Sequence, residues 1–259
     1  VVGYYTKGKS GIESFANYYL INSNISLAEK AENDLNGVKN PGNSVYTTLD
    51  TNLQKIASDS LGMFKGAIVV SDVKTGAILA MVSKPDLDPS TVDEDWDKYL
   101  AMRDDDSVLL NRATQGQYPP GSTFKIITAL EYIRENPDSY MNYRYTCNGR
   151  YTNGADINIS CFHGSTHGEE DFFKSFAKSC NSSFANIGMS LDRDKFGKTL
   201  NELLYNEKLP LDINYNVSKL TVDGSLSDYD MSQISIGQGN ATISPIQLNM
   251  ITNAIANNG

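Results

Sequence analysis

Residues 118–125 read Tyr-Pro-Pro-Gly-Ser-Thr-Phe-Lys, and this stretch decides the prediction of the fold. The Pro-Pro-Gly sequence indicates a turn, after which residues 122–134 carry apolar side chains on most of the circumference of a predicted helix. A helix that is apolar on nearly every face is typical of a buried position. Ser122 and Lys125 are therefore predicted to open a buried helix, one turn apart on the same face.

This pair is suited to nucleophilic chemistry. The positive end of a helix dipole stabilises a developing alkoxide at Ser122, and apolar surroundings favour the neutral amine of Lys125, which can then act as a base. No histidine is needed, and the chain has only two. The same Ser-x-x-Lys pattern occurs at residues 71–74, where we expect both residues to be solvated, and at residues 175–178, where we expect an amphipathic helix with Lys178 exposed.

A second feature is the sequence Ser179-Cys180-Asn181, the only Ser-x-Asn in the chain. Its structural interpretation is a polar loop that ends the helix predicted over residues 171–178. Its functional interpretation is a hydroxyl group at Ser179 that relays a proton and an amide at Asn181 that binds a substrate backbone.

The pattern of apolar residues predicts an α+β domain, because strands are followed mostly by helices. Apolar runs at residues 67–70 and 77–82 surround a glycine-containing turn and predict a hairpin. We expect a further strand over residues 45–49 and a helix capped by Asp50. The remaining predicted helices cover residues 171–178, residues 195–205 and the last segment, in which Ser244 is the N-cap, Pro245 the first helical residue and Gly259 the C-terminal glycine.

Composition excludes several classes of protein. The chain has 259 residues, of which 40% are hydrophobic, and this fraction is sufficient for a packed core. The net charge of −9 and the lack of a Lys/Arg run argue against nucleic acid as a partner. No apolar run approaches the roughly 20 residues that span a bilayer.

The three cysteines leave three states open. Cys180 lies between the two polar residues of the Ser-x-Asn sequence, and we expect a packed, reduced thiol there. Cys147 and Cys161 flank a hairpin-like stretch and are either free thiols or a disulfide. A zinc site is the third possibility, with ligands drawn from Cys147, Cys161, His163 and His167.

Several segments in order resemble the penicillin-binding protein transpeptidases, specifically the class B, monofunctional members. Residues 111–113 and 118–125 resemble the nucleophile segment, and residues 179–181 match the second motif. Residues 236–259 resemble the segment that precedes the third motif. Further similar segments are residues 47–54, 66–83 and, less closely, 11–13. The resemblance implies the α+β fold of serine β-lactamases and penicillin-binding proteins, with an antiparallel sheet flanked by helices.

The resemblance also implies a reaction. Ser122 would attack the carbonyl between two D-alanines of a peptidoglycan stem peptide to form an acyl-enzyme, and Lys125 would take its proton. Ser179 would pass a proton to the leaving amine, and Asn181 would hold the substrate amide and Lys125. The backbone N–H of Ser122 would supply half of the oxyanion hole. β-Lactams would acylate Ser122 as substrate mimics.

The expected partners follow from the same resemblance. They are peptidoglycan stem peptides, β-lactams and lipid-linked glycan polymerases of the membrane, with no cofactor. The full-length protein is expected at the extracytoplasmic face of the bacterial plasma membrane, held by an N-terminal anchor. We expect residues 1–65 to form a linker or pedestal and residues 66–259 to form the transpeptidase domain.

The third motif of the family, Lys-Thr/Ser-Gly on a core strand, is expected after Gly239, and the sequence stops before it. We therefore expect Gly259 to mark a cut that removes the C-terminal strands, and the fragment alone to have little activity. Lys74-Thr75-Gly76 has the right residues but precedes the nucleophile, so we expect an ordinary turn. Two alternatives remain: a β-lactamase-like hydrolase or β-lactam sensor, and an inactive scaffold in the cell-wall machinery.

Overall fold

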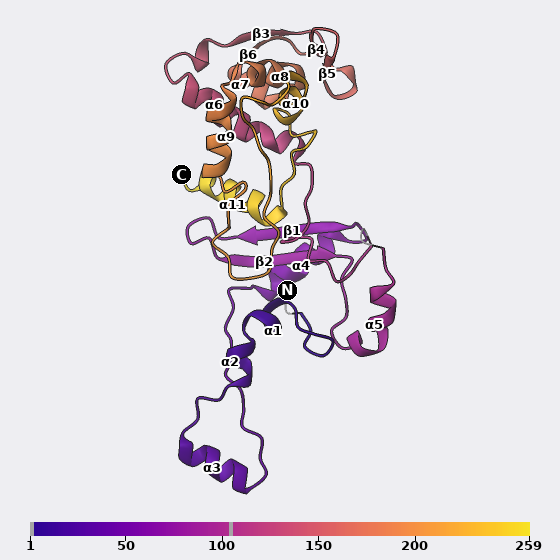
Figure 1. Cartoon of the computed structure of the whole chain (residues 1–259), viewed down its shortest axis with the longest axis vertical. Helices are drawn as coiled ribbons and strands as arrows, with labels where there is room; N and C mark the ends of the chain where they lie inside the picture. The colour runs from indigo at the N-terminus through magenta and orange to yellow at the C-terminus, as the bar shows by residue number, and fades with distance from the viewer. Residues whose placement is uncertain (1–2, 104–105) are drawn as a thin grey trace. The chain divides into compact units, whose positions relative to one another are not determined.

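The computed structural model describes residues 3–103 and 106–259 (Figure 1). The chain forms two compact units, which are described one at a time. The first unit comprises Val1–Gly116, Pro210–Asn216 and Leu248–Gly259, and the second comprises Gln117–Leu209 and Val217–Gln247.

The centre of the first unit is an antiparallel hairpin of β1 (Gly66–Ser71) and β2 (Ile78–Lys84), as the sequence predicts. Helix α4 (Thr51–Leu61) packs on this hairpin and buries a small apolar cluster with it. Asp50 caps α4, because its carboxylate accepts hydrogen bonds from the two backbone amides of Asn52 and Leu53. The predicted cap is therefore confirmed.

The strand predicted over residues 45–49 is wrong. This segment runs extended beside β2, but it makes only scattered bonds. The Thr48 hydroxyl donates to the Ile78 carbonyl at 2.6 Å, and the Asp50 amide donates to the Leu79 carbonyl at 2.8 Å. Most of the segment is exposed, so its β-branched residues lack the packing that would stabilise a paired strand.

Helix α5 (Val92–Leu100) occupies the acidic stretch in which no helix was predicted. Its first turn holds three carboxylates and its last turn a lysine, an order of charges that stabilises a helix dipole. The other helices of this unit are α1 (Gly11–Phe15), α2 (Asn17–Ile21) and α3 (Leu27–Leu35). The proposed division at residue 65 stays a prediction.

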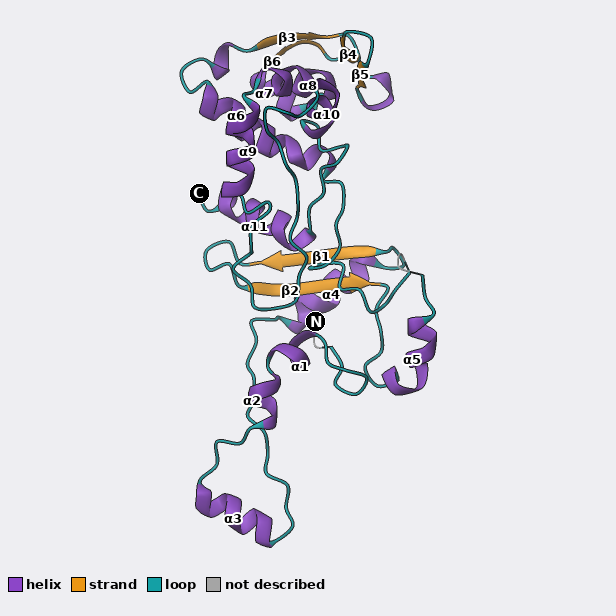
Figure 2. Cartoon of the chain, in the orientation of Figure 1, coloured by secondary structure: helices purple, strands orange, loops and turns teal. Residues whose placement is uncertain are grey.

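The second unit contains two antiparallel strand pairs and a group of helices (Figure 2). The pairs are β3 (Arg144–Cys147) with β6 (Gly168–Asp171), and β4 (Arg150–Asn153) with β5 (Ile157–Ser160). The helices are η1 (Gly121–Phe124), α6 (Lys125–Glu135), η2 (Tyr140–Asn142), η3 (Phe162–Gly164), α7 (Phe172–Ala177), α8 (Asn181–Ser190), α9 (Arg193–Glu202) and α10 (Asp228–Ile234). Helix α8 lies at the centre, because it contacts α6, α10, β3, β4 and β5.

The sequence predicts α7 and α9 but not α8 and α10. Helix α9 begins two residues earlier than predicted and ends at Glu202, where the prediction continued to residue 205. Helix α8 is buried on most sides and most of its residues are small or polar, so its sequence shows no clear amphipathic period. One of these is Gly188, where an added Cβ would lie 1.7 Å from the Ser235 hydroxyl. Close packing of α8 against α10 therefore requires glycine there.

Helix α11 (Pro245–Ala256) begins as predicted, with proline at its first position and Ser244 before it. The Ser244 hydroxyl accepts a hydrogen bond from the Gln247 amide at 3.4 Å. At 12 residues, α11 is the longest helix in the described part of the chain. None of the described helices is long and apolar enough to cross a membrane.

Candidate active site

The nucleophile segment is fixed by its buried neighbours. Ser122 is exposed in η1, which runs directly into α6, so the first turn of the predicted helix is a 3₁₀ turn. Phe124 anchors this turn in the core, with its ring 6.2 Å from the rings of Phe196 and Tyr205. The backbone of Gly121 donates a hydrogen bond to the carbonyl of Gly237 at 2.9 Å. Two segments that are 116 residues apart in the sequence therefore meet beside Ser122.

The Ser-x-Asn sequence forms the junction between α7 and α8. Ser179 follows the end of α7 in the left-handed conformation, with φ of 51°, and the Cys180 amide donates to the Ser175 carbonyl at 3.0 Å. This is a Schellman ending, in which glycine is the usual left-handed residue. Cys180 then caps α8 by accepting from the Ser183 amide, and Asn181 is the first residue of α8. A serine at a position that favours glycine indicates a functional side chain.

Lys125 joins the two motifs. Its Nζ lies 3.2 Å from the Ser122 Oγ and 2.6 Å from the Asn181 Oδ1. The same Nζ donates to both the carbonyl and the hydroxyl of Ser179, at 2.7 and 3.0 Å. All four residues predicted for the site are thus brought together around one amine.

Two further groups hold this arrangement, and sequence reasoning named neither. The side chain of Asn181 donates through Nδ2 to the carbonyl of Ser160 at 3.0 Å, which orients its Oδ1 toward Lys125. The ring of Phe184 lies 5.7 Å from the Lys125 Nζ and covers it. A sequence does not show which backbone carbonyl accepts a hydrogen bond. Phe184 likewise has no sequence feature that distinguishes it from other apolar core residues.

The electrostatics of the site destabilise the charged form of Lys125. The side chain of Lys125 is only 2% exposed, and the four oxygens around its Nζ belong to neutral groups. Burial lowers the pKa of Lys125 to about 8, against the opposing effect of Cys180 and Cys161. With this pKa about a tenth of the amine is unprotonated at pH 7 and able to accept a proton, a far larger share than for an ordinary lysine.

The other two Ser-x-x-Lys pairs have different roles. The Ser71 hydroxyl donates to Asn249 at 2.8 Å, while Lys74 lies exposed in the turn between β1 and β2. In that turn the Asp72 carboxylate accepts from the backbone amides of residues 74 and 75, so Lys74-Thr75-Gly76 is ordinary turn structure as predicted. Ser175 is buried and accepts from Ser183 at 2.7 Å, and Lys178 is exposed.

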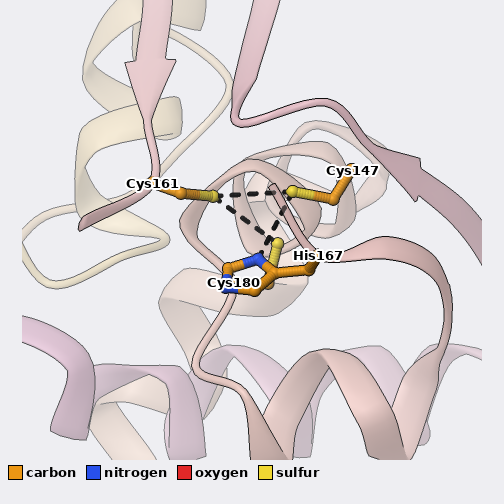
Figure 3. A group of neighbouring side chains, drawn as sticks. All are labelled: Cys147, Cys161, His167 and Cys180. Carbon is orange, nitrogen blue, oxygen red and sulfur yellow. Dashed lines mark hydrogen bonds between the residues drawn. The ribbon is translucent and has the colours of Figure 1, made fainter. Parts of the chain in front are cut away.

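The three cysteines and one histidine form a compact group that includes Cys180, the middle residue of the Ser-x-Asn junction (Figure 3). The ligand atoms of Cys147, Cys161, His167 and Cys180 all lie within 4.8 Å of one another, and the three thiols are free and buried. His163 is outside the group, so the fourth member is Cys180 and not His163. Burial raises the pKa of Cys147, but hydrogen bonds from Ser182 and nearby amides outweigh it and lower that pKa to about 6. A buried set of three sulfurs and one imidazole nitrogen is suited to a soft divalent metal ion.

Comparison with known proteins assigns the family. A sequence model described as the penicillin binding protein transpeptidase domain matches residues 66–259. The chain belongs to this family. The transpeptidase chain is 31% identical to the peptidoglycan D,D-transpeptidase PbpA of Mycolicibacterium smegmatis, over 100% of this chain and 56% of that relative. It is 30% identical to the peptidoglycan D,D-transpeptidase MrdA of Acinetobacter baumannii, over 86% of this chain and 35% of that relative.

Solved structures support the fold of the transpeptidase chain. Penicillin-binding protein A from M. tuberculosis, as an imipenem acyl-enzyme complex, matches with a TM-score of 0.86 and 23% identity, over 99% of this chain and 62% of that one. The D,D-transpeptidase domain of a peptidoglycan glycosyltransferase from Eggerthella lenta matches with a TM-score of 0.85 and 26% identity, over 100% of this chain and 61% of that one. The α+β fold expected from the sequence is therefore confirmed. The chain spans roughly a third to three fifths of the length of these proteins.

Proposed function

We propose that the protein carrying this chain is a serine D,D-transpeptidase that cross-links peptidoglycan. The observation that carries the proposal is the contact of the Lys125 Nζ with the Ser122 Oγ, together with its bonds to Ser179 and Asn181. A buried amine with a lowered pKa, beside an exposed serine, is the arrangement that an activated nucleophile requires. The names of the relatives PbpA and MrdA, both peptidoglycan D,D-transpeptidases, point to the same reaction.

The proposed reaction proceeds in two steps. In the first, the Ser122 Oγ attacks the carbonyl between two D-alanines while its proton passes to the Lys125 Nζ. The resulting tetrahedral oxyanion collapses, the C–N bond breaks, and the leaving D-alanine amine receives a proton through Ser179. In the second step, the amine of a neighbouring stem peptide attacks the Ser122 ester, and Oγ regains its proton as the cross-link forms. Asn181 holds Lys125 and the substrate amide throughout.

The remaining assignments are proposals on the same basis. β-Lactams would acylate Ser122, as the imipenem acyl-enzyme of penicillin-binding protein A suggests. We assign the protein to the class B group, with residues 1–65 as a pedestal, a membrane anchor in the full-length protein and a location outside the cytoplasm. Lipid-linked glycan polymerases are its proposed partners.

Covalent labelling of the full-length protein tests this function. Incubation with a fluorescent penicillin should give one stable adduct, and peptide mass spectrometry should place it on Ser122. Ser122→Ala should remove the adduct, whereas Thr123→Ala should retain it, because the neighbouring Thr123 hydroxyl only donates to the Pro120 carbonyl. Rapid turnover of the penicillin would favour a hydrolase instead. Absence of any adduct in the folded protein would favour a scaffold.

The pKa of Lys125 gives a pH prediction. The base form of this amine is the unprotonated one, so the rate of acylation by penicillin should rise with pH and level off above the folded-state pKa of about 8. Between pH 6 and pH 7 the rate of acylation should increase close to tenfold, because the unprotonated fraction of Lys125 increases by that factor. Stopped-flow acylation across a pH series would measure this. A rate that is independent of pH over this interval would show that Lys125 is not the base.

A further inference from the structure

Two fully buried hydroxyl groups join α7 to α8 next to the Ser-x-Asn junction. Ser175 lies in α7 and Ser183 in the first turn of α8, and both residues are 0% exposed. The Ser183 hydroxyl donates to the Ser175 Oγ at 2.7 Å. Away from water such a bond is strong, and a buried hydroxyl that loses its partner is destabilising. The serine of an unused Ser-x-x-Lys pattern is therefore bonded across the junction to the next helix.

Tyr143 extends this pair to a third segment of the unit. Its hydroxyl lies 3.1 Å from the Ser183 Oγ and 3.0 Å from the Asn186 Oδ1, to which it donates. The ring of Tyr143 packs edge-on against Tyr132 of α6, with 5.6 Å between the ring centroids. Burial raises the pKa of Tyr143, so its hydroxyl keeps its proton across the neutral pH range. We call Ser175, Ser183 and Tyr143 the hydroxyl network.

The hydroxyl network closes the turn that presents Ser179 and Asn181. The Cys180 amide donates to the Ser175 carbonyl at 3.0 Å, so Ser175 accepts one bond from the junction and another from α8. Ser179 is left-handed, with φ of 51°, a conformation that serine keeps only when its surroundings impose it. Because Asn181 and Ser183 share the first turn of α8, the bond between the two helices also fixes the place of the Asn181 side chain.

The residues next to the two serines cover the Lys125 amine. Phe176 follows Ser175 and Phe184 follows Ser183, and the centroids of the two phenylalanine rings lie 6.1 Å apart. The Phe184 ring lies 5.7 Å from the Lys125 Nζ. Separation of α7 from α8 would therefore open this cover and admit water to the amine. Because water stabilises the charged form, the pKa of Lys125 would then rise toward that of an ordinary lysine.

We propose that the hydroxyl network positions Ser179 and Asn181 against Lys125, and thereby sets the rate at which Ser122 is acylated. This inference rests on the proposed function. The members of the hydroxyl network are positioning residues, because the Lys125 Nζ is bonded to Ser179 and Asn181 and the network acts through these two. Loss of the network should therefore slow acylation even where the protein stays folded.

Two variants of the full-length protein separate positioning from stability. Ser183→Ala leaves the Ser175 hydroxyl buried without its partner, so both stability and acylation should fall. Ser175→Ala combined with Ser183→Ala removes both hydroxyls, and a paired replacement of this kind is close to neutral for stability. Denaturant unfolding should therefore show that the double variant is at least as stable as the single one. Its acylation by a fluorescent penicillin should nevertheless be about tenfold slower than that of the wild type at pH 7, because a smaller fraction of Lys125 is unprotonated.

The pH dependence of acylation is a readout that a merely structural role would not move. In the double variant the rate should level off about one pH unit higher than in the wild type, because the more solvated amine has a higher pKa. Ser232→Ala is the matched control. Ser232 is equally buried, but its hydroxyl donates to the Tyr229 carbonyl within α10, so its substitution should leave the acylation rate and its pH dependence unchanged.

Backbone hydrogen exchange tests the same inference without acylation. In the double variant, exchange should rise at residues 179–184 and stay unchanged in β1 and β2, which lie in the other unit. Unchanged exchange at residues 179–184 would show that the hydroxyl network does not order the junction. A rise in β1 and β2 as well would mean general unfolding, which contradicts a local positioning role.

The outcomes separate this inference from the proposed function. If acylation of the double variant recovers together with stability, or levels off at the wild-type pH, the hydroxyl network is only structural and the proposal is wrong. If the folded wild-type protein is not acylated at all, the transpeptidase function fails, and hydrogen exchange then decides whether the hydroxyl network orders residues 179–184.

Discussion

Lys125→Met should slow acylation of the full-length protein by penicillin about 10³-fold, within the range of about 10²–10⁴ expected for a general base. Methionine fills similar volume but offers no amine for the proton of Ser122. The Lys125 Nζ is bonded to the nucleophile and to both residues of the Ser-x-Asn junction, so its removal also releases Ser179 and Asn181. Measurement of the rate constant for adduct formation, with circular dichroism to verify folding, tests this prediction.

Lys74→Met is the matched control for this substitution. Lys74 also follows a serine by three residues and heads the Lys-Thr-Gly sequence, but it is exposed in the β1–β2 turn. Acylation should therefore remain within about twofold of the wild type, as expected for a surface substitution. A loss at Lys74 comparable to that at Lys125 would contradict both the assignment of the base and the interpretation of residues 74–76 as a turn.

Gly237→Ala should lower the free energy of unfolding by about 2–5 kcal/mol, as the sum of a left-handed alanine and overpacking. Gly237 has φ of 76°, and an added Cβ would lie 1.9 Å from the Gly121 carbonyl oxygen and 2.8 Å from the Phe124 Cβ. Both neighbours belong to the turn that presents Ser122, so acylation should slow as well. Denaturant unfolding and the acylation rate measure the two effects.

Gly154→Ala separates the two contributions. Gly154 has a similar φ of 63° in the turn between β4 and β5, and no described atom lies within 4 Å of an added Cβ. Its substitution should therefore cost only the conformational part, about 1–2 kcal/mol, and should leave acylation unchanged. Equal losses of stability at the two glycines would show that the close contact between Gly237 and Gly121 does not contribute to the free energy lost on substitution.

Strongly patterned segments were predictable, and weakly patterned ones were not. The hairpin of β1 and β2 and the helix after Ser122 follow from apolar periodicity and turn residues, which are local properties. Residues 45–49 have the composition of a strand but make only scattered hydrogen bonds to β2, and α8 is a helix with little amphipathic pattern. In both cases tertiary packing outweighs local propensity.

The candidate site also combines features that local sequence spacing predicts with features that only the tertiary structure decides. The spacing of Ser122 and Lys125 on one helix places them within reach of each other whatever surrounds them. The cysteine cluster is different, because sequence distance favours the wrong histidine: His163 lies two residues after Cys161 and His167 lies six residues after it. Only the chain path through η3 and β6 brings His167 into the group and leaves His163 outside.

By itself, the sequence determined the family and the α+β class and predicted the pairing of Ser122 with Lys125, because these depend on short-range spacing and on ordered motifs. Only the tertiary structure decided what surrounds the Lys125 amine: the Ser179 carbonyl, the Asn181 side chain and the ring of Phe184. It also decided that three cysteines and one histidine, including Cys180 of the Ser-x-Asn junction, meet in one group. The physical reason is that burial and ligand geometry arise from residues distant in the sequence, whose meeting depends on how the whole unit packs.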